Sequence, residues 1–339
     1  MAKDPQKKLQ MADIARLAGV SVSTVSRALS GSSLVNEETR QRVAELARSM
    51  NYTINLGAQA LRLRKNQTIA VVVPFDATTR QHISDPFFLA IVGALADALT
   101  ERGYDMLLSR VDLEQLDTAA RLVDGGKAIG LIVIGQWRHH EQLNALADRG
   151  VPLVVWGAHM PHQRYCSVGG DNLAGGLVAT RHLLAAGRRH IAFLGDASLP
   201  EVMLRHEGHL QALAEAGIAR DALLDLPVPF EVGAARATLD ALFASGTPVD
   251  GVLACSDLLA LQALQAAQAA GREVPRDVAV VGYDDMPLAA YSSPALTSVH
   301  QPLDQAGTNI VDALLGLLAG ETVAPRTLPV HLVVRDSAP

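Results

Sequence analysis

The stretch MADIARLAGVSVSTVSRALSG, residues 11–31, decides the fold of the N-terminal part of the chain. One face of a first short helix is apolar at helical spacing: Met11, Ile14, Ala15 and Ala18. Gly19 can adopt the positive φ that a tight turn requires. Ser21 can cap a second helix by accepting from its free N–H groups. These features predict a helix-turn-helix, whose second helix enters the major groove of DNA.

The second helix has a buried face and an outward face. Val25, Ala28 and Leu29 are predicted to pack on the first helix. The outward positions are Val22, Ser23, Ser26 and Arg27. In a helix-turn-helix, side chains on such a face contact either base edges or phosphates.

The sequence from Val20 to Ser30, VSVSTVSRALS, resembles the pattern VSxxTVSRxLN of the LacI/GalR family of bacterial transcription regulators. Only Ser30 departs, where the family usually has Asn. The resemblance continues to the last predicted strand, so it covers essentially the whole chain. It implies a DNA-binding regulator, most often a repressor, with a helix-turn-helix head at residues 8–53.

The resemblance also implies roles for the residues of the reading helix. Val22, Ser23 and Arg27 are expected against base edges, where Arg27 could reach a guanine or a phosphate. The residues expected to hold phosphates are Ser21, Thr24, Ser26 and Ser30.

A short basic segment, residues 54–66, joins the head to the rest of the chain. On its residues alone it is equally a flexible linker or a short helix capped by Asn55. The family resemblance implies a hinge helix that folds on operator DNA. In that interpretation Leu61 enters the minor groove and kinks a base step, and Asn55 belongs to the DNA-binding set.

Charge is divided unevenly along the chain. Residues 1–65 hold 11 Lys and Arg against 5 Asp and Glu, whereas the remainder holds 18 against 30. A local charge of +6 is suited to DNA phosphates despite the overall charge of −6. The N-terminus lacks an apolar signal segment, and no apolar run is long enough for a membrane span. A cytoplasmic protein without membrane association is therefore expected.

From Thr68 onward, apolar strands alternate with helices, which predicts parallel sheets buried on both faces. The pattern restarts near residue 170, so two doubly wound lobes in tandem are expected, similar to the periplasmic-binding-protein-like core of the family. This core is predicted at 67–339. The first lobe is expected at about 67–167 and 300–322, and the second at about 168–298 and 324–339. The expected crossings between lobes lie near 167–169, 297–301 and 320–325.

Effector candidates come from the carboxyl ends of the strands, where such folds bind ligands. Trp156 and Asp284 are candidates because they lie at strand ends. The resemblance adds Phe87, Phe88, Arg205 and Phe230. Plain core packing is an equal alternative for Phe87 and Phe88, and Asp257 is either a helix cap or a ligand contact. Aromatic faces with one Arg and one Asp favour a sugar.

Several alternatives remain open at this point. A purine or nucleoside could also be held by aromatic side chains and an Arg. A sugar-binding module without DNA function would be expected to carry an export signal and no basic head. We find no catalytic motif, and we expect no cofactor and no metal. No heptad tail follows the last predicted strand, so we expect a homodimer on a pseudo-palindromic operator.

Overall fold

The computed structural model describes residues 11–29, 34–50, 66–75, 82–138, 140–219, 224–230 and 233–339. The chain divides into two compact units, Met1–Asn66 and Gln67–Pro339, which we describe separately. Three predicted DNA contacts, Ser30, Asn55 and Leu61, lie outside the described residues.

The described residues of the first unit form helices α1 (Met11–Ala18), α2 (Val22–Leu29) and α3 (Glu37–Ser49). Its small core joins all three helices: Ile14, Ala15, Ala18, Val25, Ala28 and Val43 are buried. Leu29 packs partly buried against this core. The predicted division of α2 into a buried and an outward face is therefore confirmed.

The local signals of the head are also confirmed. Gly19 has a φ of +67° at the turn between α1 and α2. The Oγ of Ser21 accepts from the Thr24 backbone N–H at 3.1 Å. Asn36 caps α3 in the same way, since its side chain accepts from the Thr39 N–H at 2.8 Å. Each cap satisfies a donor that the first turn of a helix leaves unpaired.

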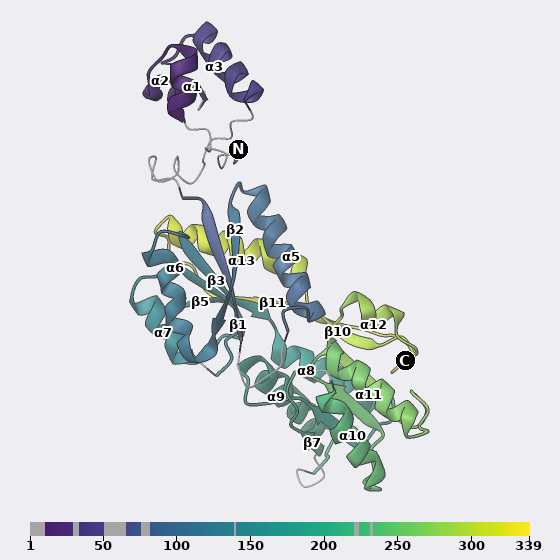
Figure 1. Ribbon diagram of the computed structural model, residues 1–339. Helices are drawn as coiled ribbons and strands as arrows, with labels where there is room; N and C mark the ends of the chain where they lie inside the picture. The colour runs from purple at the N-terminus through teal and green to yellow at the C-terminus, as the bar shows by residue number, and fades with distance from the viewer. Residues whose placement is uncertain are drawn as a thin grey trace, which may run out of the picture. The chain divides into compact units, whose positions relative to one another are not determined.

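The second unit begins with a six-stranded parallel sheet, ordered β11-β5-β4-β3-β1-β2. Its strands are β1 (Thr68–Phe75), β2 (Asp105–Asp112), β3 (Gly130–Ile134), β4 (Leu153–Trp156), β5 (Cys166–Gly170) and β11 (Arg326–Leu328). In Figure 1, the carboxyl end of β1 points toward the second sheet.

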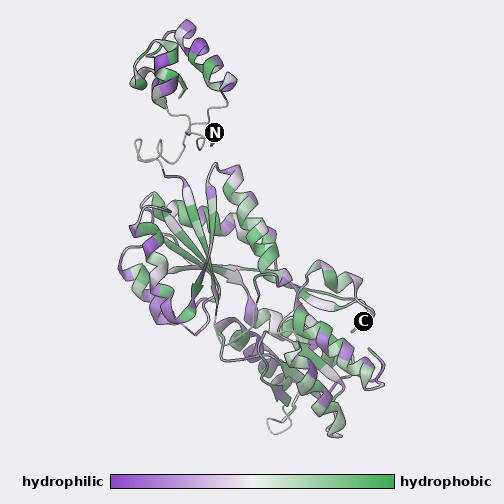
Figure 2. Cartoon of the chain, in the orientation of Figure 1, coloured by the Kyte–Doolittle hydropathy of each residue, from purple (hydrophilic) through white to green (hydrophobic). Residues whose placement is uncertain are grey.

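Helices cover both faces of this sheet. Along β1, Ile69, Val71 and Val73 pack with α5 (Pro86–Glu101) and α13 (Leu303–Leu318). The alternate residues Ala70 and Val72 pack on the opposite face. That face is covered by η1 (Leu113–Ala119), α6 (Ala120–Asp124) and α7 (His140–Asp148). Burial on both sides explains why the inner strands β1, β3 and β4 are almost entirely apolar (Figure 2).

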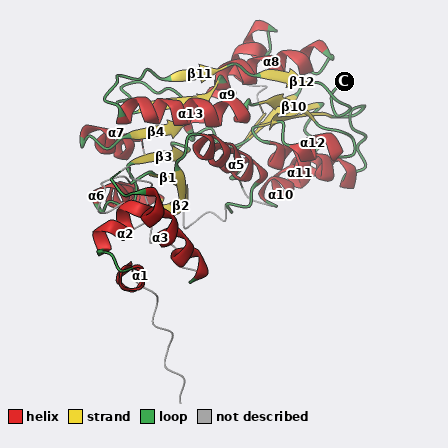
Figure 3. Ribbon diagram, turned by 90° about the horizontal axis from the view of Figure 1, so that it is seen from above, coloured by secondary structure: helices red, strands yellow, loops and turns green. Residues whose placement is uncertain are grey.

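The second lobe has its own six-stranded sheet, ordered β12-β10-β9-β8-β6-β7. Its strands are β6 (Ile191–Leu194), β7 (Leu224–Leu226), β8 (Gly251–Ala254), β9 (Ala279–Asp284), β10 (Thr297–His300) and β12 (His331–Val333). The helices are α8 (Asn172–Ala185), α9 (Pro200–Glu215), α10 (Ala234–Ala244), α11 (Asp257–Ala269) and α12 (Pro287–Tyr291). Figure 3 shows α8 with α9 on one face and α10 with α11 on the other.

The end of the chain differs from the prediction. The segment expected as one final strand forms two, since Leu328 ends β11 in the first sheet and β12 pairs antiparallel with β10 in the second. Pro329 between them has no N–H to donate, so it cannot continue a ladder. The first lobe therefore includes residues up to Gly170 and again β11, so two crossings fall after 170 and after 328, later than expected.

Candidate DNA-reading face and effector cleft

The outward face of α2 presents short polar side chains. Ser21, Val22, Ser23 and Arg27 are exposed, and Thr24 and Ser26 are partly exposed. The hydroxyl of Ser21 lies 2.8 Å from both the Ser23 and the Thr24 hydroxyls. Hydroxyls at a helix N-terminus suit phosphate binding, because the free N–H groups and the helix dipole point the same way. The described part of the predicted DNA-binding set thus lies at one end and on one face of α2.

A cavity with about 670 Å³ of empty space, partly continuous with solvent, lies between the two lobes. All six predicted effector residues line it. The first lobe contributes Asp85, Phe87, Phe88, Ile134, Gly135, Trp137 and Trp156; the second contributes Leu199, Glu201, Val202, Arg205, Phe230, Ser256 and Asp284.

The aromatic wall from the first lobe is fixed by a helix cap. The carboxylate of Asp85 accepts from the Phe87 N–H at 3.0 Å, which fixes the first turn of α5. The rings of Phe87 and Phe88 meet edge to face, with centroids 5.6 Å apart. Phe88 and Trp156 also belong to the apolar core of the lobe. Core packing and cavity lining are therefore compatible for these side chains.

Arg205 is the only basic side chain among the described residues that line the cavity. It is 7% exposed, and its guanidinium lies 3.7 Å from the centre of the Tyr283 ring. Nε donates to Asn172 Oδ1 at 2.8 Å, and Nη1 donates to the Cys255 carbonyl at 2.5 Å. Since a guanidinium has five N–H donors, others remain for a ligand.

Asp284 ends β9 in an unusual backbone conformation, with a φ of +108°. Such a conformation costs on the order of 1–3 kcal/mol and persists only where the surroundings impose it. Gln301 Nε2 donates to Asp284 Oδ1 at 2.7 Å. Burial raises the pKa of Asp284 well above its usual value, and the nearby Arg205 only partly offsets this.

Several lining residues were not predicted from the sequence. Trp137 follows β3 in a left-handed turn, with a φ of +51° after Gly135 at +89°. Glu201 was missed because α9 begins at Pro200, earlier than the start expected near Arg205. Pro at the first helical position was the available signal. With that start, Glu201 and Arg205 are four residues apart on one helical face.

Comparison with known proteins agrees with both units. Residues 10–55 match the bacterial regulatory proteins of the lacI family, and residues 180–338 match a periplasmic binding protein-like domain. The HTH-type transcriptional regulator CelR of Thermobifida fusca is 34% identical over 331 residues, which cover 96% of each protein. The chain belongs to the LacI family of bacterial transcriptional regulators.

Solved structures extend this similarity over the whole chain. A CelR–cellobiose complex has a TM-score of 0.72 and 32% identity, covering 97% of this chain and 99% of that one. The lac repressor dimer bound to operator and the anti-inducer ONPF has a TM-score of 0.87 and 26% identity, covering 98% and 99%. The LacI-family fold of a helical head and two parallel α/β lobes is thus confirmed.

In this LacI-family chain, a buried amide positions the loop that carries Trp137. Gln136 is fully buried, and its Nε2 donates to the Ala158 carbonyl at 2.6 Å and to the Tyr165 hydroxyl at 2.7 Å. Its Oε1 accepts from the Ala158 N–H at 2.9 Å. Because buried polar groups are costly to leave unpaired, this network holds the loop in one conformation.

The interpretation of Asp257 as a helix cap is wrong. Ser256 caps α11, since its Oγ accepts from the Leu259 N–H. The carboxylate of Asp257 instead accepts from the Ser298 hydroxyl at 2.6 Å and the Met286 N–H at 2.7 Å. Burial raises the pKa of Asp257 to about 7. Asp257 therefore joins α11, β10 and the start of α12, and Ser256 lines the cavity.

In the part of the chain that the structure describes, no helix combines the length and apolar character needed to span a bilayer.

Proposed function

We propose that this LacI-family regulator represses genes of carbohydrate use, and that a sugar bound between the lobes changes its affinity for operator DNA. The observation that carries the proposal is the cavity itself. It combines aromatic side chains from both lobes with Arg205 on α9 and Asp284 at the carboxyl end of β9. Aromatic faces suit the apolar side of a sugar ring, and the charged groups suit its hydroxyls.

The similar proteins support a sugar as effector. A CelR structure holds cellobiose, and a regulator of Enterococcus faecium, 28% identical, holds ribose. In this chain, such a ligand would lie in the cavity between the lobes, which side chains of both lobes line.

On DNA, the regulator acts as a homodimer in this proposal. The lac repressor was solved as a dimer on its operator. Two-fold symmetry requires a pseudo-palindromic site, with one head in each half-site. Val22, Ser23 and Arg27 read base edges, and the hydroxyls around Ser21 hold phosphates. The hinge segment, with Asn55 and Leu61, completes the contact at the centre of the operator.

The effector acts by linkage. It can shift the arrangement of the lobes only as far as its affinities for the two arrangements differ. A changed arrangement alters the spacing of the paired hinges and thereby the affinity for DNA. The regulator turns over no substrate and resides in the cytoplasm, where its operator lies.

A purine or nucleoside is the second candidate effector. The five aromatic side chains that line the cavity (Phe87, Phe88, Trp137, Trp156 and Phe230) favour it, because they could also stack on a nucleobase.

The test begins with selection of operator DNA from a random pool by the purified full chain. We expect a palindrome, and operator affinity that falls steeply with salt because residues 1–65 carry a net charge of +6. Cellobiose, ribose, hypoxanthine and guanosine are then titrated by calorimetry and added to operator-binding assays. Binding of a sugar with a changed operator affinity supports the proposal. Response to a purine alone would replace the sugar, and selection of no palindrome would overturn the regulatory role.

A further inference from the structure

The charged groups of the cleft are unbalanced. Four of the described lining residues carry ionisable charge, and three of these are acids: Asp85, Glu201 and Asp284. Asp85 comes from the first lobe, whereas Glu201 and Asp284 come from the second. The acids therefore face the cavity from both lobes, and Arg205 is the single base among the described lining residues.

No cation neutralises these three carboxyl groups by direct contact. Within the described part of the chain, Asp85 accepts from the Phe87 N–H and Asp284 accepts from the Gln301 amide. Glu201 Oε1 accepts from the Gln136 N–H at 3.5 Å. None of the three forms an ion pair there, and Arg205 donates instead to Asn172 Oδ1 and to the Cys255 carbonyl.

Burial also changes the pKa of these three carboxyl groups. Desolvation raises the pKa of Asp85, Glu201 and Asp284, although Arg205 partly offsets this for Glu201 and Asp284. The same poor solvation disfavours a carboxylate or phosphate that a ligand brings into the cavity. A ligand that brings a further negative charge would add repulsion in a poorly solvated space.

Glu201 is placed to impose this repulsion where an anion would otherwise bind. A carboxylate or phosphate entering the cleft would be drawn to the guanidinium of Arg205. Glu201 lies one helical turn before Arg205 on α9, and both line the cavity. An anion that contacts Arg205 must therefore approach the carboxyl group of Glu201.

We propose that Glu201, supported by Asp85 and Asp284, is a specificity-determining residue that selects effectors by charge. Uncharged, hydroxyl-rich ligands enter the cleft, and carboxylated or phosphorylated ligands of the same shape are rejected. This inference rests on the proposed sugar-binding function and narrows its ligand class.

The test uses ligands matched in shape. Glucose, glucuronate and glucuronamide form one set. Cellobiose, cellobiouronate and the amide of cellobiouronate form a second. Binding to the full-length protein is measured by calorimetry at pH 7.5. We expect the neutral sugar and the amide of a set to bind, and the carboxylate to bind at least tenfold more weakly than its amide.

Two variants assign the effect to Glu201. Glu201→Gln keeps the shape of the side chain and removes its charge. It should therefore reduce the ratio of the amide's affinity to the carboxylate's affinity at least threefold. Glu207→Gln removes the same charge from an exposed position of α9 and should leave this affinity ratio unchanged. Unchanged operator affinity of both variants, measured without ligand, verifies folding.

The possible failures are distinct. A carboxylate that binds within twofold of its amide overturns charge selection and leaves sugar binding intact. If Glu201→Gln leaves the affinity ratio of amide to carboxylate unchanged, Glu201 does not determine the charge specificity. If no member of either set binds or affects operator affinity, the proposed sugar-responsive function fails, and the charge inference fails with it.

Discussion

At the scale of single residues, burial determines the hydrogen bonding and the protonation of polar side chains inside the second lobe. Arg205 is stabilised by hydrogen bonds and by the face of Tyr283 rather than by an ion pair. Neutral groups thus offset the free-energy cost of burying the Arg205 guanidinium, and its charge remains available to a ligand in the cleft. The same helix carries buried His209, whose consequence for stability can be measured.

We predict that His209 makes the stability of the chain sensitive to mild acid. It is 1% exposed, its Nδ1 lies 2.9 Å from the Thr180 hydroxyl, and burial lowers its pKa to about 4. Unfolding restores a pKa of roughly 6.5, so the unfolded state gains a proton first as pH falls. The contribution of neutral His209 to the free energy of unfolding is complete above pH 6.5 and is lost as the pH falls toward 4. Between pH 7.5 and 5.0 the loss from this group is about 2 kcal/mol.

The measurement is urea unfolding followed by circular dichroism at the two pH values. His209→Asn retains a donor for Thr180 but does not titrate, so its stability should fall with pH less steeply than that of the natural chain. His190→Asn, at an exposed position, should behave like the natural chain. Equal pH dependence in all three proteins would show that His209 does not carry the effect.

The sequence predicted some residues of the cleft and not others for a physical reason. Trp156 and Asp284 end apolar strands, and the topology of such sheets brings strand ends to one edge. Trp137 and Glu201 reach the cavity through a left-handed turn and an early helix start. Neither detail follows from hydrophobic periodicity, which fixes element type better than element boundaries. The effector roles of all these residues stay predictions.

At the scale of elements, continuous apolar strands were predictable, and short edge strands were not. β1, β3 and β4 are buried on both faces and therefore have unmistakable apolar runs. β7 and β11 have three residues each and lie at the edges of their sheets. Their pairing depends on tertiary contacts rather than on pattern, so the lobe crossing after Leu328 could not be located from the sequence.

The two faces of α2 allow stability and recognition to be separated within one helix. Val22 is 38% exposed and Val25 is fully buried in the core of the head. Val22→Ala should leave the melting of the head nearly unchanged and alter the base preference in operator selection. Val25→Ala removes two buried methyl groups and should cost about 2 kcal/mol of stability.

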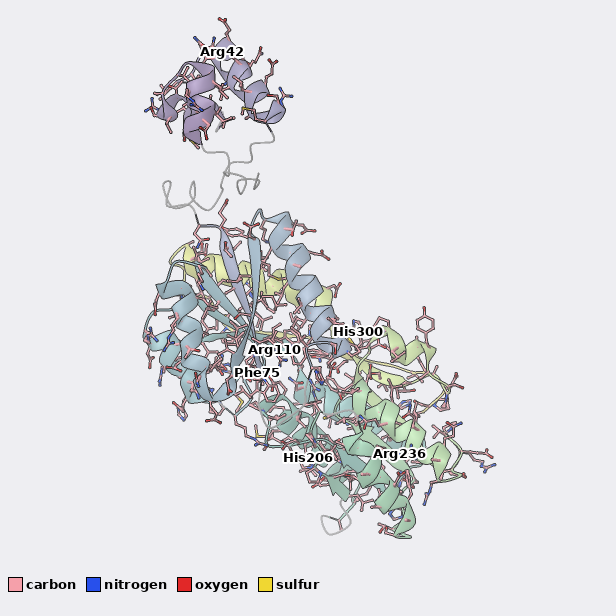
Figure 4. All side chains as sticks on the ribbon, in the orientation of Figure 1. Arg42, Phe75, Arg110, His206, Arg236 and His300 are labelled. Carbon is pink, nitrogen blue, oxygen red and sulfur yellow. The ribbon has the colours of Figure 1, made fainter. Side chains whose placement is uncertain are left out.

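The head is followed by thermal melting, and base preference by sequencing of DNA selected from a random pool. Figure 4 shows Arg42 on α3 of the same unit, and Arg42→Ala serves as a control for loss of a positive charge away from α2. Identical selected sites for Val22→Ala and the natural chain would contradict the assignment of Val22 to base reading.

At the scale of the whole molecule, the two lobes are joined at the rim of the cleft by charged side chains. Arg138, which follows β3, lies 2.6 Å from Asp196, which follows β6. Its Nε also donates to the Ser198 hydroxyl at 2.8 Å. Burial alone would raise the pKa of Asp196, but hydrogen bonds from Ser198 and Arg138 outweigh it and lower the pKa. This contact stabilises the lobe arrangement seen here.

We predict that Arg138→Gln weakens effector binding without touching the cavity lining. The pair is partly exposed, with Arg138 61% and Asp196 25% accessible, so its loss should cost the lobe arrangement seen here no more than about 1 kcal/mol. A ligand that requires this arrangement would then bind up to about fivefold more weakly.

Calorimetry with cellobiose in 0.05 and 0.5 M salt provides the measurement. Because salt screens the pair, high salt should bring the cellobiose affinity of the natural chain toward that of the variant. Arg276→Gln removes ion pairs within a single lobe and is the matched control. Equal cellobiose affinity of Arg138→Gln and the natural chain at low salt would show that the rim contact does not govern closure.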